Sequence, residues 1–105
     1  DPVGVADAHK TLETAYAMID GQLAGKQWAT GDTFTIADCA ATPALFYASM
    51  VHPFPSSHEW LAAYFERLLT RPSVKRALAE ATPYFSMFPY REAMPERFAT
   101  GSAFA

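Results

Sequence analysis

Apolar residues at helical spacing constrain the fold of this chain more than any other feature. One stripe consists of Leu12, Tyr16, Ile19 and Leu23. Their steps of four, three and four place them on one side of an amphipathic helix. No proline interrupts residues 5–23, and Gly25 then supplies a stop signal, because glycine takes the left-handed conformation that ends many helices. We therefore predict a helix over residues 5–23.

Prolines divide the rest of the chain into further segments, and we predict helices over residues 36–50, 57–70 and 73–81. Pro43 should kink the first of these, since proline removes one backbone hydrogen bond. No segment alternates with period two for long enough to indicate a strand. The sequence thus predicts an all-α fold, a bundle of about four helices over residues 1–90, followed by a C-terminal tail over residues 91–105. Residues 84–105 are rich in aromatic residues and proline, and we expect an extended conformation there.

Composition excludes several classes of function. The formal net charge of −3 provides no basic field for a nucleic acid or an anionic membrane. No apolar run approaches the roughly 18 residues of a membrane span, and no signal peptide opens the chain. A single cysteine cannot form an internal disulfide, which favours a cytoplasmic protein. The first residue is Asp1 rather than Met, so we expect further residues upstream.

The stretch from Thr35 to Asp38 fits a capping box. The Thr35 hydroxyl can accept from the Asp38 amide, and the Asp38 carboxylate can accept from the Thr35 amide. Phe34 and Cys39 flank the box and would form its hydrophobic staple. Such a cap is worth about 1 kcal/mol. Because no partner stands at a spacing suited to acid catalysis or metal binding, we assign Thr35 and Asp38 structural roles.

A second capping box is predicted at the next helix start. Ser56 would be the cap, and Glu59 would reach back to it. Pro55 and Trp60 would form the corresponding staple.

The remaining reactive side chains give no catalytic constellation. Cys39 lies in the first turn of a helix, which can lower a thiol pKa, but a small buried apolar role is favoured. His9, His52 and His58 form no i,i+4 pair and no cluster with cysteine, so no metal site is expected. Phosphate-binding loops, nucleophile elbows and dinucleotide motifs are absent from the sequence. We predict no catalytic residue.

The aromatic residues near the C-terminus have binding potential. This group comprises Phe85, Phe88, Tyr90 and Phe98. So many apolar rings are expected to pack against other apolar groups rather than remain in water. The favoured interpretation is that they pack back on the bundle, and the alternative is that some of them line an apolar pocket.

Several motifs together resemble the C-terminal domain of cytosolic glutathione transferases. They are "LAG", "QWATGDTFTIADCAATPAL", "LAAYFERLLTRPSVKRAL" and "PYF", and the resemblance runs to about Pro89. Its most specific part is Gly31-Asp32-x-Phe34-Thr35-Ile36-Ala37-Asp38, similar to that family's capping box and staple. "RPSVKR" is a softer match, and the sequence beyond Tyr90 carries no diagnostic motif.

The resemblance implies a division of labour. A thioredoxin-like N-terminal domain, absent from this sequence, would bind glutathione and supply the catalytic Tyr, Ser or Cys. The first helix of the usual helical domain is also expected to precede Asp1. This chain would form a wall of the pocket for small hydrophobic electrophiles, with Phe85, Phe88 and Tyr90 as candidate substrate-binding residues. It would hold no cofactor and be inactive alone, with glutathione as the co-substrate of the parent enzyme.

The resemblance also implies a homodimer, and we expect the first helix to expose an apolar face that favours self-association. An alternative function is that of a non-catalytic docking module with the same fold. An unrelated helical bundle that happens to contain a capping box is a third, weaker alternative.

Overall fold

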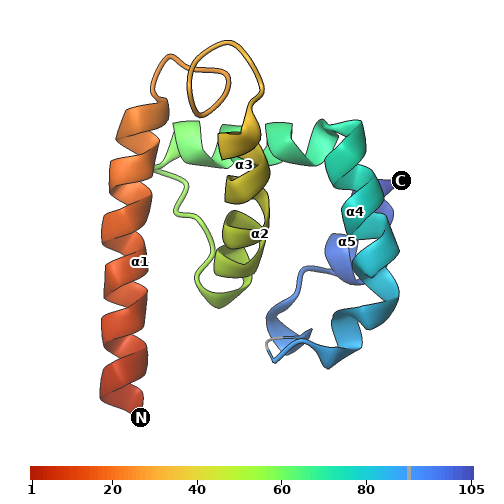
Figure 1. The fold of residues 1–105 in the computed structure, drawn as a ribbon. Helices are drawn as coiled ribbons and strands as arrows, with labels where there is room; N and C mark the ends of the chain where they lie inside the picture. The colour runs from red at the N-terminus through yellow and green to blue at the C-terminus, as the bar shows by residue number, and fades with distance from the viewer. Residues whose placement is uncertain (90) are drawn as a thin grey trace.

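The computed structural model describes residues 1–89 and 91–105 of the chain (Figure 1). Its main elements are the helices α1 (Pro2–Leu23), α2 (Ile36–Val51), α3 (Glu59–Thr70) and α4 (Pro72–Ala81). Within the described residues no strand occurs, and an isolated antiparallel bridge joins Trp28 to Gly31. The predicted all-α fold and its four principal helices are confirmed.

Helix α3 is the centre of the arrangement. It packs against α1, α2 and α4, and Figure 1 shows it crossing between α1 at one side and α4 at the other. Its Leu61 and Leu68 are fully buried, and Tyr64 and Phe65 are nearly so. The largest part of the core therefore gathers around α3.

Helix α1 begins three residues before the predicted start. The Asp1 carboxylate accepts from the Val3 amide at 3.1 Å, and Pro2 occupies the first turn, where its missing N–H costs nothing. The predicted stripe faces the core, with Tyr16 and Leu23 buried and Leu12 and Ile19 partly buried. The helix ends at Leu23, followed by Gly25 with φ of 75°.

The predicted second capping box is wrong. Helix α3 starts at Glu59, and its cap residue His58 makes no side-chain capping bond. The amide of His58 instead donates to the carbonyl oxygen of Pro55 at 3.0 Å, so a turn occupies the positions where Ser56 would cap the helix. Trp60 is 46% exposed rather than buried in a staple. The α3 start is capped from α1, where the Asp20 carboxylate accepts from the Leu61 amide at 2.9 Å.

The C-terminal segment is not extended, contrary to the prediction for residues 84–105. It folds into short helices, namely η1 (Thr82–Met87), η2 (Arg91–Ala93), α5 (Glu96–Ala99) and η3 (Ser102–Phe104). Phe85, Phe98 and Phe104 are buried, and each ring lies 5.0–6.4 Å from that of Phe46 in α2. Burial of these rings holds the segment against the bundle, which fits the favoured packing interpretation.

Among the described residues, no helix combines the length and the apolar character needed to cross a lipid bilayer.

Candidate functional site

Asp38 is a fully buried carboxylate at the start of α2. Its Oδ2 accepts from the Thr35 amide at 2.9 Å, and the Thr35 hydroxyl accepts from the Ala37 amide at 3.3 Å. The two reciprocal bonds of a capping box are present. Asp38 Oδ1 also accepts from the Tyr64 hydroxyl at 2.6 Å and from the Ala29 amide at 2.8 Å. One side chain thus joins α2 to α3 and to the preceding loop.

These contacts fix the protonation of the Asp38–Tyr64 pair. Burial raises the pKa of the Asp38 carboxyl. Hydrogen bonds from Tyr64, Ala29 and Thr35 together lower it by more, so the net pKa lies below the usual 3.8. Burial, the hydrogen bond to Asp38 and its charge all raise the pKa of Tyr64 above its usual value of 10.0. The carboxylate stays ionised and the phenol stays neutral at physiological pH, as a structural link requires.

Cys39 is exposed, so the favoured buried interpretation of this thiol is wrong. It lies beside a groove between α2 and α4 that is lined by Thr42, Pro43, Val74 and Leu78 among others. Phe34 makes its ring contacts elsewhere: its ring centroid lies 5.1 Å from that of Trp28, and the Arg71 guanidinium lies 3.9 Å from it. The entry to α2 is therefore held by a cation–π contact, which the sequence pattern did not reveal.

The structure brings two of the three predicted substrate-binding residues together. Phe85 and Phe88 have ring centroids 5.2 Å apart. Phe85 is only 4% exposed, while Phe88 is partly buried beside Tyr47 of α2. Tyr90 lies outside the described residues. Phe85 therefore belongs mainly to the core, and Phe88 is the more accessible of the pair.

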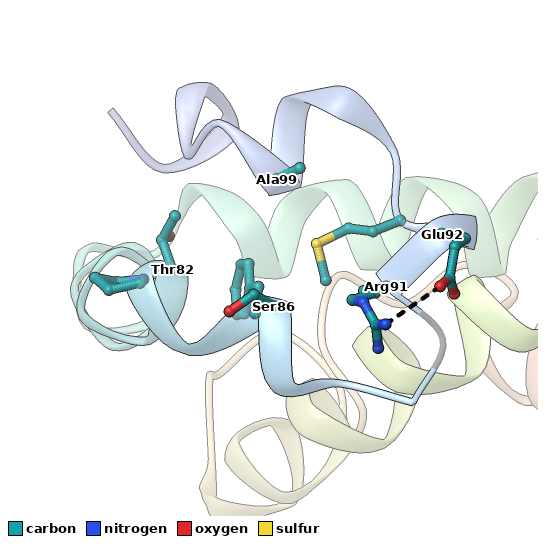
Figure 2. Close-up of a pocket in the computed structure, with 8 residues that line it drawn as sticks. Thr82, Ser86, Arg91, Glu92 and Ala99 are labelled. Carbon is teal, nitrogen blue, oxygen red and sulfur yellow. Dashed lines mark ion pairs between the residues drawn. The ribbon is translucent and has the colours of Figure 1, made fainter.

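A pocket of about 380 Å³ opens beside Phe85 (Figure 2). Thr82 and Ser86 reach it from η1, Arg91 and Glu92 from η2, and Ala99 from α5. The Arg91 guanidinium pairs with the Glu92 carboxylate at 3.6 Å. The sequence pattern did not reveal the polar residues of this lining, because only folding of the C-terminal segment brings them near Phe85.

A second candidate surface is an apolar groove along α1 and α2. It consists of two hollows of about 230 and 410 Å³ that share Ala44. Apolar residues dominate both linings: Leu12, Ile19, Leu23, Ala41, Leu45, Ala48 and Val51. The apolar lining of this groove suits binding of an apolar group.

The histidines are less scattered than the sequence indicates. Nδ1 of His9 in α1 lies 2.7 Å from Nδ1 of His52, the residue after α2. His58 lies apart from them, with its Nδ1 3.9 Å from the Asp20 carboxylate. A separation of 43 positions along the chain hid the first pair from any local motif.

Comparison with known proteins identifies the fold family. Residues 2–67 match the family model described as "Glutathione S-transferase, C-terminal domain". The chain belongs to this family. It is also 36% identical over 72 residues to "Glutathione S-transferase GST-4.5" of Xanthomonas campestris pv. campestris. No solved structure gives a significant match.

The extent of these matches bears on the site. The similar region covers 69% of this chain but only 35% of the Xanthomonas protein, so the chain spans about a third of that relative. Thr35 and Asp38 lie inside the family match, whereas Phe85, Phe88 and the pocket beside them lie beyond residue 67. The family match therefore covers the capping region, and the substrate-binding roles of the C-terminal residues stay predictions.

Proposed function

We propose that this chain is the electrophile-binding part of a glutathione transferase that adds the glutathione thiolate to small hydrophobic electrophiles. The observation that carries the proposal is the family match over residues 2–67. The apolar groove along α1 and α2 and the pocket beside Phe85 support it, because concave apolar surfaces suit such substrates.

Activation of glutathione belongs, in this proposal, to a thioredoxin-like domain elsewhere in a cytoplasmic parent protein. Thiolate formation needs a group that lowers the sulfur pKa and holds the anion. The helical part contributes position, because holding the electrophile beside a thiolate accelerates the bimolecular step. This chain alone would then bind electrophile weakly and conjugate nothing.

The test uses the whole parent protein and a chloronitroaromatic electrophile. Phe88→Ala should raise KM for the electrophile, because the Phe88 ring packs against Phe85, which lines the pocket. KM for glutathione should stay unchanged, because the proposal assigns glutathione binding to another domain. Met87→Ala is the matched control, since Met87 is 77% exposed. An unchanged electrophile KM in the Phe88 variant would remove that residue from the substrate site.

Glutathione binding by the chain alone and by the parent separates the two parts. We expect binding only in the parent, and tight binding by the chain alone would contradict this division of labour. A parent that neither binds glutathione nor conjugates electrophiles would favour the docking-module alternative.

Association of two copies is part of the same proposal. Val3, Val5 and Met18 of α1 are 69%, 56% and 59% exposed, and exposed apolar side chains favour contact between molecules. We expect sedimentation to show self-association that increases with protein concentration. A strict monomer at high concentration would contradict a homodimer built on α1.

A further inference from the structure

The contact between His9 and His52 joins the middle of α1 to the end of α2. Their Nδ1 atoms are 2.7 Å apart, and the ring centroids are 4.8 Å apart with a 60° angle between ring planes. At this distance one nitrogen must donate and the other accept, so at least one Nδ1 carries a free lone pair directed at its neighbour.

His52 is held in place from two sides. Its carbonyl oxygen accepts from the Tyr16 hydroxyl at 2.8 Å, and its Nε2 lies 3.4 Å from the Glu13 carboxylate. A carboxylate facing Nε2 favours a proton on that nitrogen, which leaves the lone pair on Nδ1. Histidines that bind metals commonly donate their other ring N–H to a carboxylate in this way.

We propose that Nδ1 of His9 and Nδ1 of His52 bind a divalent transition-metal ion of the Zn²⁺, Ni²⁺ and Cu²⁺ class. Imidazole suits these ions, with metal–nitrogen distances of about 2.0–2.1 Å. Two such ligands are about 2.9 Å apart at the right angle of a tetragonal Cu²⁺ or Ni²⁺ ion and about 3.3 Å apart at the tetrahedral angle of Zn²⁺. The 2.7 Å between these nitrogens therefore has to lengthen when an ion binds. Small ring rotations that turn both lone pairs toward a common point complete the arrangement.

The surroundings admit a hydrated cation. The His52 side chain is 18% exposed and Glu13 is 59% exposed, so the pair lies at the surface beside a negative charge. Glu13 lies beside Nε2 of His52 rather than beside Nδ1, and it acts as a positioning residue. Across residues 1–89 and 91–105, no group of three or more His, Cys, Asp or Glu side chains is arranged to hold a metal. The protein therefore supplies two ligands, and water supplies the others.

Two protein ligands make the site exchangeable rather than a permanent structural centre, in contrast to closed four-ligand zinc sites. The bound ion links α1 to the end of α2, next in sequence to Ala8 and Val51, which line the apolar groove. An ion that binds only the folded chain stabilises it, and the unfolding temperature then rises with metal concentration.

The experiment titrates Zn²⁺ into the tag-free chain by calorimetry. His9→Gln and His52→Gln should each weaken binding at least tenfold, because each removes one of two ligands. His58→Gln is the matched control and should bind as the wild type does. Electron paramagnetic resonance with Cu²⁺ should show two nitrogen ligands in the wild type and one in each variant of the pair.

Unchanged affinity in His9→Gln, or a loss caused by His58→Gln, would overturn the proposal. If a glutamine variant fails to fold, ring signals of the wild-type histidines in proton NMR decide the matter. Signals of His9 and His52 should shift on addition of Zn²⁺ while that of His58 stays in place, and any other pattern counts against the site. Glu13→Gln should weaken binding severalfold without changing the number of nitrogen ligands.

Discussion

Asp38 does more than a helix cap requires. A capping box needs one bond from the N3 carboxylate to the cap amide, and here the same carboxylate also accepts from Tyr64 and from the Ala29 amide. Removing it leaves a buried hydroxyl and a partly buried amide without their acceptor, and unsatisfied buried donors are costly.

Asp38→Ala should lower the free energy of unfolding by about 2–3 kcal/mol, because buried donors lose their partner. Thr35→Ala should cost about 1 kcal/mol, as an ordinary cap does. Urea denaturation followed by circular dichroism measures both. Equal losses in the two variants would show that the bonds to Tyr64 and Ala29 add nothing beyond the cap.

The same carboxylate gives stability a defined pH dependence. The folded-state pKa of Asp38 is lowered, while the unfolded chain keeps the ordinary value of 3.8. Its contribution is therefore complete above that unfolded value and is lost as the pH falls through the folded-state pKa. We expect Asp38→Asn to destabilise the chain more at pH 7 than at pH 3, in denaturation curves recorded at both. An identical deficit at both values would contradict the ionised role.

Helix α3 illustrates how an element can take its cap from a distant part of the chain. The sequence around its start contains a plausible local signal, Ser56 with Glu59, yet its Leu61 amide donates to Asp20 on α1. The two residues are 41 positions apart. A local motif search had no means of pairing them.

Asp20→Ala should cost about 1 kcal/mol, the value of a lost cap, in thermal or urea unfolding. Ser56→Ala is the matched comparison and should be nearly neutral, since Ser56 is exposed and the structure starts α3 at Glu59. The reverse order of effects would restore the local capping box.

Local patterns predicted the elements better than their contacts. The stripe on α1 and the break at Gly25 depend on neighbours along the chain, so α1 was placed to within three residues at its start and correctly at its end. Cys39 and the tail were misjudged because burial depends on what packs nearby. Phe98 and Phe104 reach Phe46, more than fifty positions away in sequence.

The candidate site divides in the same way. The clustering of aromatic residues in sequence predicts Phe85 and Phe88 as substrate-binding residues, and that role stays a prediction. The Arg91–Glu92 pair near Phe85 and the His9–His52 contact are visible only in the folded chain. Residues that meet only through tertiary packing leave no periodic signal.

At the scale of the whole molecule, the C-terminal segment completes the core. Phe98 is 1% exposed and lies between Phe46, Phe65 and Phe104. The Arg97 guanidinium also bridges α5 to α3 through two bonds to the Glu66 carboxylate, at 2.7 and 3.1 Å. The bundle of residues 1–90 therefore relies on apolar area from beyond its predicted boundary.

Phe98→Ala should destabilise the chain by about 3–5 kcal/mol, the usual cost of removing a buried ring. That is a large share of the stability of a small domain. Met87→Ala, at an exposed position of η1, should change the unfolding temperature little. A mild effect of Phe98→Ala in calorimetry would mean that the bundle is stable without the tail.

The hydrogen bond from the Leu61 amide to Asp20 makes exchange of this amide proton a measure of how α1 packs against α3. The Leu61 amide lies in the first turn of α3, where helical amides have no partner within their own helix. Its protection from exchange with deuterium depends on the α1 carboxylate. If α1 separates from α3, the Leu61 amide loses its acceptor and exchanges, while amides in the middle of α3 stay protected. The exchange rate of this amide therefore measures how often α1 separates from α3.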